Sequence, residues 1–165
     1  MKKYELVVIG GGSGGMAAAL AARGEGVREV PVLEQGEELG GILLQCIHNG
    51  FGLHTFGEEL TGPAYAERYA DRVAAEKIEV KTGTFVRKLG RGRTVSYVNG
   101  QEGYVTIEAG AVVLAMGCRE RPWGAVSIPG SRPAGVWTAG TAQRYLNLEG
   151  YMVGRRVWIL GSGDI

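Results

Sequence analysis

The sequence contains few cysteines, no long hydrophobic run and almost no net charge. Its two cysteines, Cys46 and Cys118, lie 72 residues apart, which is unlike the close pairs of a disulfide framework or a structural zinc site. No stretch of 18 or more apolar residues occurs, so we expect no membrane span. Eighteen Lys and Arg against 17 Asp and Glu give a net charge of +1, which does not indicate a nucleic-acid partner. We expect a cytoplasmic protein without a metal site.

Glycine, by contrast, is abundant. There are 29 glycines among 165 residues, about 18% against a usual share of about 7%. No Gly-X-Y period accompanies them and only 5 residues are proline, which excludes collagen and proline-rich disorder. Hydrophobic residues make up 45% and charged residues 21%, as in an ordinary globular chain. Because ordered glycine costs backbone entropy, we expect several turns that pass close to a ligand.

The order of predicted elements indicates an α/β fold. Residues 4–9 and 27–33 have the apolar, β-branched composition of buried parallel strands, and the alanine-rich residues 14–23 favour a helix between them. Together they form one βαβ unit. The later elements that the sequence predicts are helices over 67–77 and 138–148, strands over 79–80, 84–89, 112–115 and 156–160, an antiparallel hairpin of 94–98 and 104–108, and a loop or linker over 117–135. The fold class is therefore Rossmann-like, with a parallel sheet and a small antiparallel β-meander.

The first chemical motif is the run of glycines between the first strand and the first helix. Gly10, Gly12 and Gly15 satisfy the GxGxxG pattern, with Ser13 and Gly14 inside it. The first glycine of this pattern permits the tight turn, the second lets a pyrophosphate approach the backbone, and the third lets helix and strand pack closely. Free amides at the helix N-terminus and the helix dipole then hold the phosphates. The motif predicts a binding site for an adenine dinucleotide.

Glu34 strengthens this interpretation. It ends the second predicted strand, 24 residues after Gly10, about the distance at which a carboxylate meets the ribose hydroxyls of a bound dinucleotide. An acid at this place disfavours a 2′-phosphate, so the ligand should be FAD or NAD(H) and not NADP(H). The alternative is a glycine-rich hairpin with Glu34 as a solvated strand end. The position of the motif between a strand and a helix favours the dinucleotide site.

The segment after Glu34 resembles the two-dinucleotide-binding flavoproteins, the broad glutathione-reductase and thioredoxin-reductase superfamily. In that superfamily the second strand ends in an acid, and a glycine pair shortly afterwards lets the chain run beside the flavin. Here the pair is Gly40-Gly41. The resemblance implies that Gln35 and Ile42, next to the acid and the glycine pair, also contact the cofactor.

Two further segments carry the same resemblance. Residues 112–117 (VVLAMG) look like the family's strand that ends in Ala-Thr-Gly, with Met116 in place of threonine between Ala115 and Gly117. Val86 falls where the family's main chain contacts adenine. Together these matches imply that FAD, and not NAD, occupies the first site of an incomplete FAD-binding domain.

The cysteine pattern departs from the disulfide reductases of this superfamily. Those enzymes carry CxxxxC just after the glycine pair or CxxC in their second dinucleotide domain, whereas this chain has only Cys46 in that region. Without a partner thiol Cys46 cannot form the dithiol that passes electrons to a disulfide. A disulfide reductase is disfavoured, and Cys46 is a weak candidate for a catalytic nucleophile because most free cysteines are small buried hydrophobes. The resemblance would place His48 near the flavin, but we favour a hydrogen-bonded structural role for it, and we expect His54 to be structural as well.

Three segments narrow the resemblance: residues 40–52, 114–122 and 138–165. They look like the NAD/FAD-dependent dehydrogenases associated with glycerol-3-phosphate dehydrogenase, and they are similar to the FAD-binding subunits of opine oxidase, hydrogen cyanide synthase, sarcosine oxidase and proline dehydrogenase. This implies hydride transfer through flavin, from an amine, amino acid or similar small metabolite, or electron relay to a partner oxidoreductase subunit in an oligomeric complex. In this family Arg119 and Arg121 either face the flavin edge or linker, or cap loop carbonyls.

The last motif is the opening of a second phosphate turn. Gly161 and Gly163 follow the strand-like residues 156–160, and no third glycine follows. In this family the segment looks like the start of the NAD-binding domain. We expect residues 1–150 to be the N-terminal part of an FAD-binding domain, and residues 151–165 to be a linker and the first strand of a truncated NAD-binding domain. NAD would then be a second cofactor of a longer intact protein. The alternative function is a non-catalytic module that holds an adenine dinucleotide.

Overall fold

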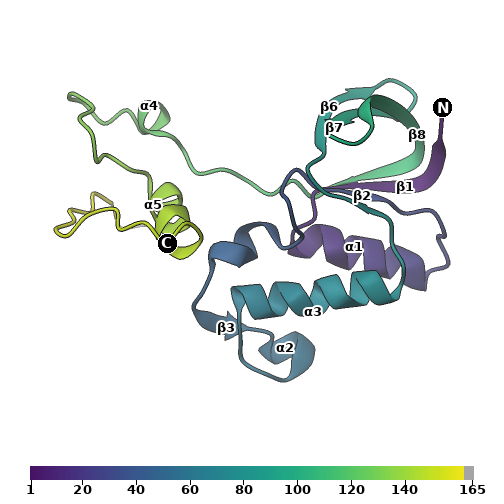
Figure 1. Cartoon of the computed structure of the whole chain (residues 1–165), viewed down its shortest axis with the longest axis horizontal. Coiled ribbons are helices and arrows are strands. Elements are labelled where there is room, and N and C mark those ends of the chain that lie inside the picture. The colour runs from purple at the N-terminus through teal and green to yellow at the C-terminus, as the bar shows by residue number, and fades with distance from the viewer. Residues whose placement is uncertain (162–165) are drawn as a thin grey trace. The chain divides into compact units, whose positions relative to one another are not determined.

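The computed structural model describes residues 1–161, which Figure 1 draws in colour. Their contacts divide the chain into two compact units, Met1–Gly117 and a second unit that begins at Cys118. Each unit is described by itself. No helix in the described part of the chain is long and apolar enough to cross a bilayer.

A six-stranded sheet organises the first unit, with the strand order β5-β2-β1-β8-β7-β6. Strands β5, β2 and β1 and the end of β8 are parallel, whereas β6, β7 and the start of β8 form an antiparallel meander. The strands of this sheet are β1 (Lys3–Ile9), β2 (Val32–Leu33), β5 (Val80–Lys81), β6 (Phe85–Gly90), β7 (Thr94–Asn99) and β8 (Gly103–Leu114). The predicted Rossmann-like sheet with a small meander is confirmed.

Strand β8 differs from the sequence-based expectation, which divided it into strands over 104–108 and 112–115. It is one continuous strand that exchanges partners along its length. Its first half pairs antiparallel with β7, and its second half pairs parallel with β1, up to Ile9 opposite Leu114. Gly110 does not interrupt the strand; a Cβ atom there would lie 2.6 Å from the carbonyl oxygen of Glu5. Glycine therefore lets two backbones approach closely here instead of marking a turn.

Strand β2 is shorter than the predicted 27–33, because only its last two residues form a ladder. The preceding residues accept hydrogen bonds from β1, at 3.2 Å from Leu6 N–H to Glu29 O and 3.0 Å from Val8 N–H to Pro31 O. Pro31 has no N–H to donate in return, so the ladder begins after it.

Two helices cover one face of the sheet, as Figure 1 shows: α1 (Ser13–Gly24) and α3 (Gly62–Ala75). Alternate residues of β1 point to opposite faces. Val8 packs with Met16 of α1 and Val73 of α3, in a first core between sheet and helices. Val7 packs with Tyr97 in a second core, which the meander encloses. Helix α3 begins five residues before the predicted residue 67, because Thr61 caps it; its hydroxyl accepts a hydrogen bond from Ala64 N–H at 3.3 Å.

Short elements that were not predicted from the sequence connect β2 to α3. They are η1 (Gly41–Gln45), β3 (Asn49–Phe51), α2 (Leu53–Phe56) and β4 (Leu60–Thr61), of which β3 and β4 pair antiparallel. Aromatic rings hold this segment on α3: Phe56 lies edge-on to Tyr65 and Tyr69, with ring centroids 5.5 and 5.7 Å apart. Elements of two to five residues carry too little periodicity to be read from sequence.

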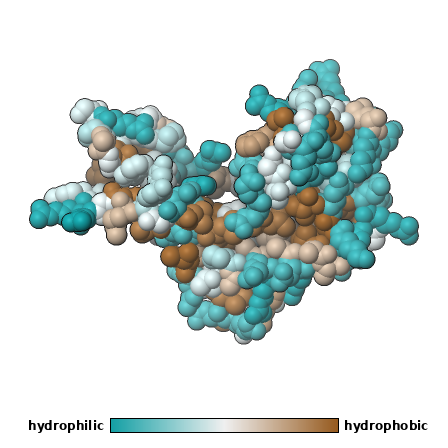
Figure 2. All heavy atoms as spheres, in the orientation of Figure 1, coloured by the Kyte–Doolittle hydropathy of each residue, from teal (hydrophilic) through white to brown (hydrophobic). Residues whose placement is uncertain are grey.

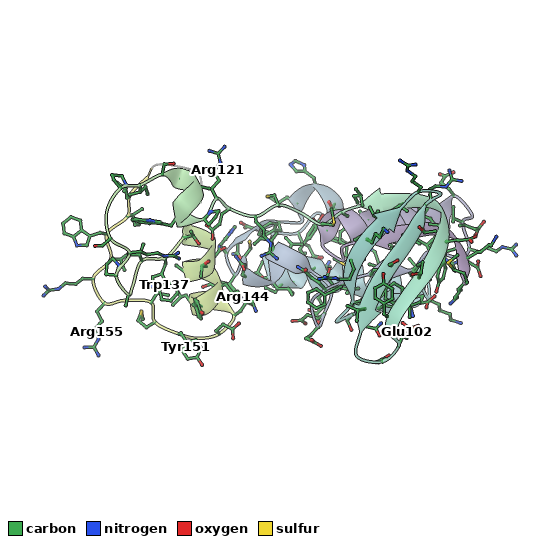
Figure 3. All side chains as sticks on the ribbon, turned by 90° about the horizontal axis from the view of Figure 1, so that it is seen from above. Glu102, Arg121, Trp137, Arg144, Tyr151 and Arg155 are labelled. Atoms are coloured by element: carbon green, nitrogen blue, oxygen red, sulfur yellow. The ribbon has the colours of Figure 1, made fainter. Side chains whose placement is uncertain are left out.

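The second unit contains α4 (Trp123–Val126) and α5 (Ala139–Asn147) among its described residues. The ring of Tyr145 lies between those of Trp137 and Tyr151, with centroids 5.1 and 6.2 Å away; Figure 3 labels Trp137 and Tyr151 beside α5. The strand predicted over 156–160 is wrong for this structure. These residues have strand-like composition, but no neighbouring strand within residues 1–161 provides the hydrogen bonds that a ladder requires. The predicted domain boundary near residue 150 stays a prediction.

Candidate functional site

The turn from β1 into α1 depends on glycine at two positions. Gly10 has φ +105°, and a Cβ atom there would overlap the carbonyl oxygen of Ala115. A Cβ atom on Gly15 would overlap the carbonyl oxygen of Gly10. The first and third glycines of the GxGxxG motif therefore let β1, β8 and α1 meet at one point, as the sequence predicts.

The middle of the motif faces open space. A Cβ atom on Gly12 or Gly14 would have no atom within 4 Å, and Ser13, the first residue of α1, is exposed. The first hydrogen bond of the helix runs from Met16 N–H to Gly12 O at 3.0 Å. The earlier amides of this turn therefore point out of the helix end. No acidic residue lies in the first turn, so the positive end of the helix dipole is not neutralised there.

Glu34 joins this turn to the next loop. Its side chain is only 7% exposed, so it is not a solvated strand end. One carboxylate oxygen accepts a hydrogen bond from Gly11 N–H at 2.5 Å and the other accepts one from Gly36 N–H at 2.7 Å. Since a carboxylate offers about four lone-pair positions, two contacts leave capacity for further donors. Gln35, beside it, is exposed.

The glycine pair lies directly against the phosphate turn. Gly12 and Gly40 form an isolated parallel bridge, and Gly40 N–H donates to Gly11 O at 2.9 Å. A Cβ atom on Gly41 would lie 3.2 Å from the Cα of Gly12. Gly40 and Gly41 have φ values of +127° and +56°, which favour glycine. Two glycine-rich segments about 30 residues apart in sequence therefore lie in direct contact.

The end of β8 closes the other side of the turn. Ala115 N–H donates to Ile9 O at 2.8 Å, which places Ala115 above Gly10. Met116 follows with its side chain 65% exposed, the same exposure as Ile42 next to the glycine pair. Gly117 has φ +67° and ends the first unit. Apolar side chains thus remain exposed on two sides of the glycine turn. Figure 2 shows apolar atoms in a band between the meander and the helices of this unit.

Comparison with known proteins identifies this arrangement. Residues 4–165 match the family described as pyridine nucleotide-disulphide oxidoreductase. The chain belongs to this family. Members are FAD-dependent oxidoreductases, and the Rossmann-like fold of residues 1–117 is the fold that binds FAD in them.

Curated relatives confirm the narrower resemblance. An opine oxidase subunit from Agrobacterium tumefaciens is 35% identical over 176 residues, which cover 98% of this chain and 33% of that protein. The hydrogen cyanide synthase subunit HcnB of Pseudomonas protegens is 28% identical, with coverage of 96% and 33%. The chain therefore spans about one third of the length of these relatives.

A solved structure supports the fold. L-proline dehydrogenase from P. horikoshii superposes with a TM-score of 0.71 at 22% identity, over 93% of this chain and 30% of that chain. At this level of identity the likeness concerns the fold alone.

In this member of the pyridine nucleotide-disulphide oxidoreductase family, Cys46 is half-buried at the end of η1. Its thiol donates to the carbonyl oxygen of Ile42 at 3.3 Å. His48 lies 2.9 Å through Nδ1 from Asn49 O and packs on Phe51, with ring centroids 5.3 Å apart. Both side chains thus have local backbone partners. A catalytic role for Cys46 stays a prediction.

Val86, the predicted adenine contact, lies in β6 opposite Tyr97 of β7. Its side chain is half-buried against the second core, so any contact with a ligand would come from its main chain. The loop before β6 is hydrogen-bonded to the main chain of Glu34, because Thr84 N–H donates to Glu34 O at 2.8 Å. The structure therefore connects Val86 to Glu34 through two intervening residues.

A cavity beside the phosphate turn was not predicted from the sequence. It has a volume of about 380 Å³. Its walls are Ser13 of α1, Leu43 of η1, Tyr65 of α3 and residues 50–55 of the β3–α2 segment. Because the short elements of that segment were not predicted, no sequence signal indicated that it would return to Ser13.

Glu120, which lies between Arg119 and Arg121, was also missed at the level of sequence. All three are exposed residues of the second unit. Glu120 caps α5: its carboxylate accepts hydrogen bonds from Gly140 N–H and Thr141 N–H, each at 2.9 Å. Glu120 lies 20 and 21 residues before the two amides that it caps. Cap residues that can be recognised in a sequence lie next to the helix, so this cap was not predicted. Gly161 has φ +140°, and Gly163 lies outside the described residues.

Proposed function

We propose that this chain is the FAD-binding part of an NAD-linked flavin dehydrogenase. The observation that carries the proposal is the contact of Gly12 with Gly40 and Gly41 beside the buried carboxylate of Glu34, at the start of α1. FAD, when bound, would supply the isoalloxazine ring that accepts a hydride. The residues described here would bind and orient it.

The residues fit the pyrophosphate of FAD. Open space over Gly12 and Gly14 permits two phosphates to approach the backbone, and a side chain at either position would project into that space. The unneutralised N-terminus of α1 supplies free amides and a favourable dipole for negative charge. Ser13 adds a hydroxyl donor at the same helix end.

Glu34 fits the adenosine ribose. Its carboxylate is held by two backbone amides at the carboxyl end of β2, and its remaining lone pairs can accept the 2′- and 3′-hydroxyls. A 2′-phosphate would face this negative group, so the site favours FAD over an NADP-type ligand. Gln35 and the main chain of Val86 flank this end of the proposed site.

The flavin ring would lie beside the glycine pair and the end of β8. Gly41 is exposed and has no side chain, and the exposed apolar side chains of Ile42 and Met116 suit a planar aromatic ring. Ala115 and Gly117 would complete this side through their main chain. Gly161 and Gly163 would belong to the phosphate turn for NAD in a longer protein.

The relatives suggest the substrate class and the assembly. Their names specify subunits of opine oxidase, hydrogen cyanide synthase and sarcosine oxidase. An opine and sarcosine are both secondary amines that carry a carboxylate. We therefore propose that the intact protein oxidises a small amine or amino acid, or relays its electrons within a complex that includes a partner oxidoreductase subunit.

Reconstitution with FAD tests the proposal. The purified chain should bind FAD, with absorbance bands near about 375 and 450 nm, in preference to NAD. Gly12→Val should abolish binding because its side chain fills the space proposed for the pyrophosphate. Gly24→Val is the matched control, since Gly24 lies at the other end of α1 and also has open space around it. A chain that binds NAD more tightly than FAD would contradict the proposal and favour a non-catalytic dinucleotide-binding module.

A further inference from the structure

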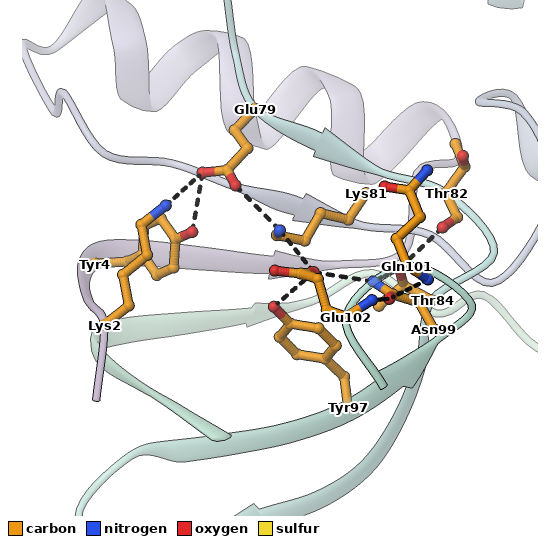
Figure 4. A network of polar contacts seen from close by, with 10 residues as sticks. All are labelled: Lys2, Tyr4, Glu79, Lys81, Thr82, Thr84, Tyr97, Asn99, Gln101 and Glu102. Carbon is orange, nitrogen blue, oxygen red and sulfur yellow. Dashed lines mark hydrogen bonds and ion pairs between the residues drawn. The ribbon is translucent and has the colours of Figure 1, made fainter. Parts of the chain in front are cut away.

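A polar network lies at the tip of the β7–β8 hairpin, far in sequence from the phosphate turn (Figure 4). Its centre is the carboxylate of Glu102, which Figure 3 also labels. One oxygen of Glu102 accepts hydrogen bonds from Lys81 Nζ at 2.8 Å, Asn99 Nδ2 at 3.0 Å and the Tyr97 hydroxyl at 3.1 Å. Lys81 also pairs with Glu79 at 3.3 Å. The hairpin tip is thereby fastened to β5, the opposite edge strand of the sheet.

Lys81 forms ion pairs with two carboxylates of this network, Glu79 and Glu102. Burial alone would lower the pKa of Lys81, but its hydrogen bonds to Glu102 and Glu79 outweigh burial and raise that pKa above the usual lysine value. Bonds from Lys81 and Asn99 lower the pKa of the Glu102 carboxyl. Both groups therefore stay charged at neutral pH. The Lys81 side chain is 16% exposed, so solvent screens the pair less than an ordinary surface ion pair.

Asn99 extends the network to a buried residue. Its side-chain oxygen accepts hydrogen bonds from Gln101 N–H at 3.1 Å and Glu102 N–H at 2.7 Å, which fixes the hairpin turn. Its Nδ2 donates to the hydroxyl of Thr84 at 3.2 Å. Thr84 is 1% exposed, and its hydroxyl also donates to Thr82 O at 2.9 Å. The hairpin tip therefore contacts the 81–84 turn at both Lys81 and Thr84.

The 81–84 turn forms hydrogen bonds with both the N–H and the carbonyl oxygen of Glu34. Glu34 N–H donates to Lys81 O at 2.9 Å, and Thr84 N–H donates to Glu34 O at 2.8 Å. Gly83 N–H donates to Gly36 O at 2.8 Å. The main chain of Glu34 thus has its hydrogen-bond partners in the 81–84 turn. Asn99 and Glu102 contact the same turn.

We propose that Asn99 and Glu102 are positioning residues for the adenosine end of the dinucleotide site. They act through Thr84 and Lys81, which set the place of Glu34 and of the start of β6. The inference rests on the proposed function, because Glu34 is the residue assigned to the ribose. It gives the meander a role in the dinucleotide site, in addition to enclosing the second core.

The contact between Asn99 and Thr84 can be broken from either side. Asn99→Ala removes the donor, together with the side-chain bonds of Asn99 inside the hairpin turn. Thr84→Val removes the acceptor with little change of shape, together with the bond from the Thr84 hydroxyl to Thr82 O. Ser96→Ala is the matched control: it removes a hydrogen bond of 2.9 Å to Thr106 in the same two strands without touching the 81–84 turn. The dissociation constants of FAD and of ADP, which represents the adenosine half alone, are measured for each variant of the full chain.

We expect Asn99→Ala and Thr84→Val each to weaken the binding of FAD and of ADP by about three- to tenfold, the usual effect of losing the one contact that they share. The loss in the double variant should be smaller than the sum of the two single losses, because each single change already removes the contact between Asn99 and Thr84. Ser96→Ala should bind within about twofold of the wild type. The Thr84 amide, which bonds Glu34 O, should exchange with solvent faster in Asn99→Ala and not in Ser96→Ala, a change that general loss of stability would not confine to one variant.

Two results would overturn the inference in distinguishable ways. If the wild-type chain binds neither FAD nor ADP, the proposed function and the positioning role are both wrong. If the wild type binds both ligands and Asn99→Ala matches Ser96→Ala in affinity and in Thr84 exchange, the proposed function stands and only the positioning role is rejected.

Discussion

A Cβ atom on Gly15 would overlap the carbonyl oxygen of Gly10. The obstacle is backbone and not a flexible side chain, so neither partner can turn aside. Gly10 is itself fixed between Leu33, whose carbonyl accepts its N–H at 2.8 Å, and the carbonyl of Ala115. The turn therefore requires glycine for packing before any ligand is considered.

Gly15→Ala should accordingly destabilise the first unit even without cofactor. We expect a loss of about 1–3 kcal/mol, the usual cost of inserting a methyl group into a packed site, measured as the free energy of unfolding in urea. Gly24→Ala is the control on the same helix, where the added methyl group meets open space and alanine has the higher helix propensity. Equal stability of the two variants would show that α1 can shift away from β1.

Replacing Glu34 should affect both stability and binding. Glu34→Gln puts an amide nitrogen against either Gly11 N–H or Gly36 N–H, so one buried donor loses its acceptor. We expect a loss of about 1–3 kcal/mol in the free energy of unfolding, together with weaker FAD binding. Glu38→Gln is the control, because it makes the same change at a nearby exposed carboxylate. A fully stable Glu34→Gln variant would be inconsistent with the buried two-amide contact.

The cap of α5 should make the second unit sensitive to acid. Burial alone would raise the pKa of Glu120, but hydrogen bonds from Thr138 and from the amides of Gly140 and Thr141 outweigh it and lower that pKa below its ordinary value of 4.5. A lowered folded-state pKa means that the stabilisation is complete above the ordinary value and is lost as the pH falls through the folded-state pKa.

Glu120→Gln should remove this acid dependence. Its helical signal for residues 139–147, followed by amide exchange, should match the acidified wild type at every pH. The variant should lose about 1 kcal/mol of cap stabilisation at neutral pH. Glu149→Gln is a useful comparison, since Glu149 pairs with Arg144 near the other end of the helix at 3.1 Å. An unchanged pH profile in Glu120→Gln would assign the acid sensitivity to another group.

Cys46→Ala should leave FAD binding within about twofold of the wild type. The thiol of Cys46 donates to Ile42 O, a weak hydrogen bond at the end of a short turn. Absorbance and dissociation of FAD measure the effect, with Cys118→Ala as the control from the second unit. Loss of FAD binding in Cys46→Ala alone would indicate that the thiol takes part in the cofactor site.

Much of the proposed site could be predicted from the sequence, because its signals are local. Gly10, Gly12 and Gly15 follow one strand and begin one helix, and Gly40-Gly41 is a short motif of a large family. These residues indicate close backbone approach wherever they occur in this order. The contact between Gly12 and Gly40 was not predicted from these motifs and is seen only in the structure.

The remaining features depend on contacts that are distant in sequence. Asn99 reaches Thr84 across 15 residues, and Glu120 reaches Thr141 across 21. No period or spacing in the sequence indicates such pairs. Gly110 lies between the strands predicted over 104–108 and 112–115, and in the structure its lack of a side chain admits the backbone of Glu5. Its meaning becomes clear only when the neighbouring strand is known.

Because β8 is continuous, its pairing with β7 also determines where Ala115 lies relative to Gly10. One end of this strand is set by its pairing with β7, where Asn99 lies opposite Gly103. Its other end carries Ala115 to the carbonyl contact over Gly10. A slip of one residue at the hairpin would turn Ile107 out of the second core and move Ala115 away from that contact. The number of residues between the hairpin and Ala115 therefore determines which residue of β8 contacts Gly10.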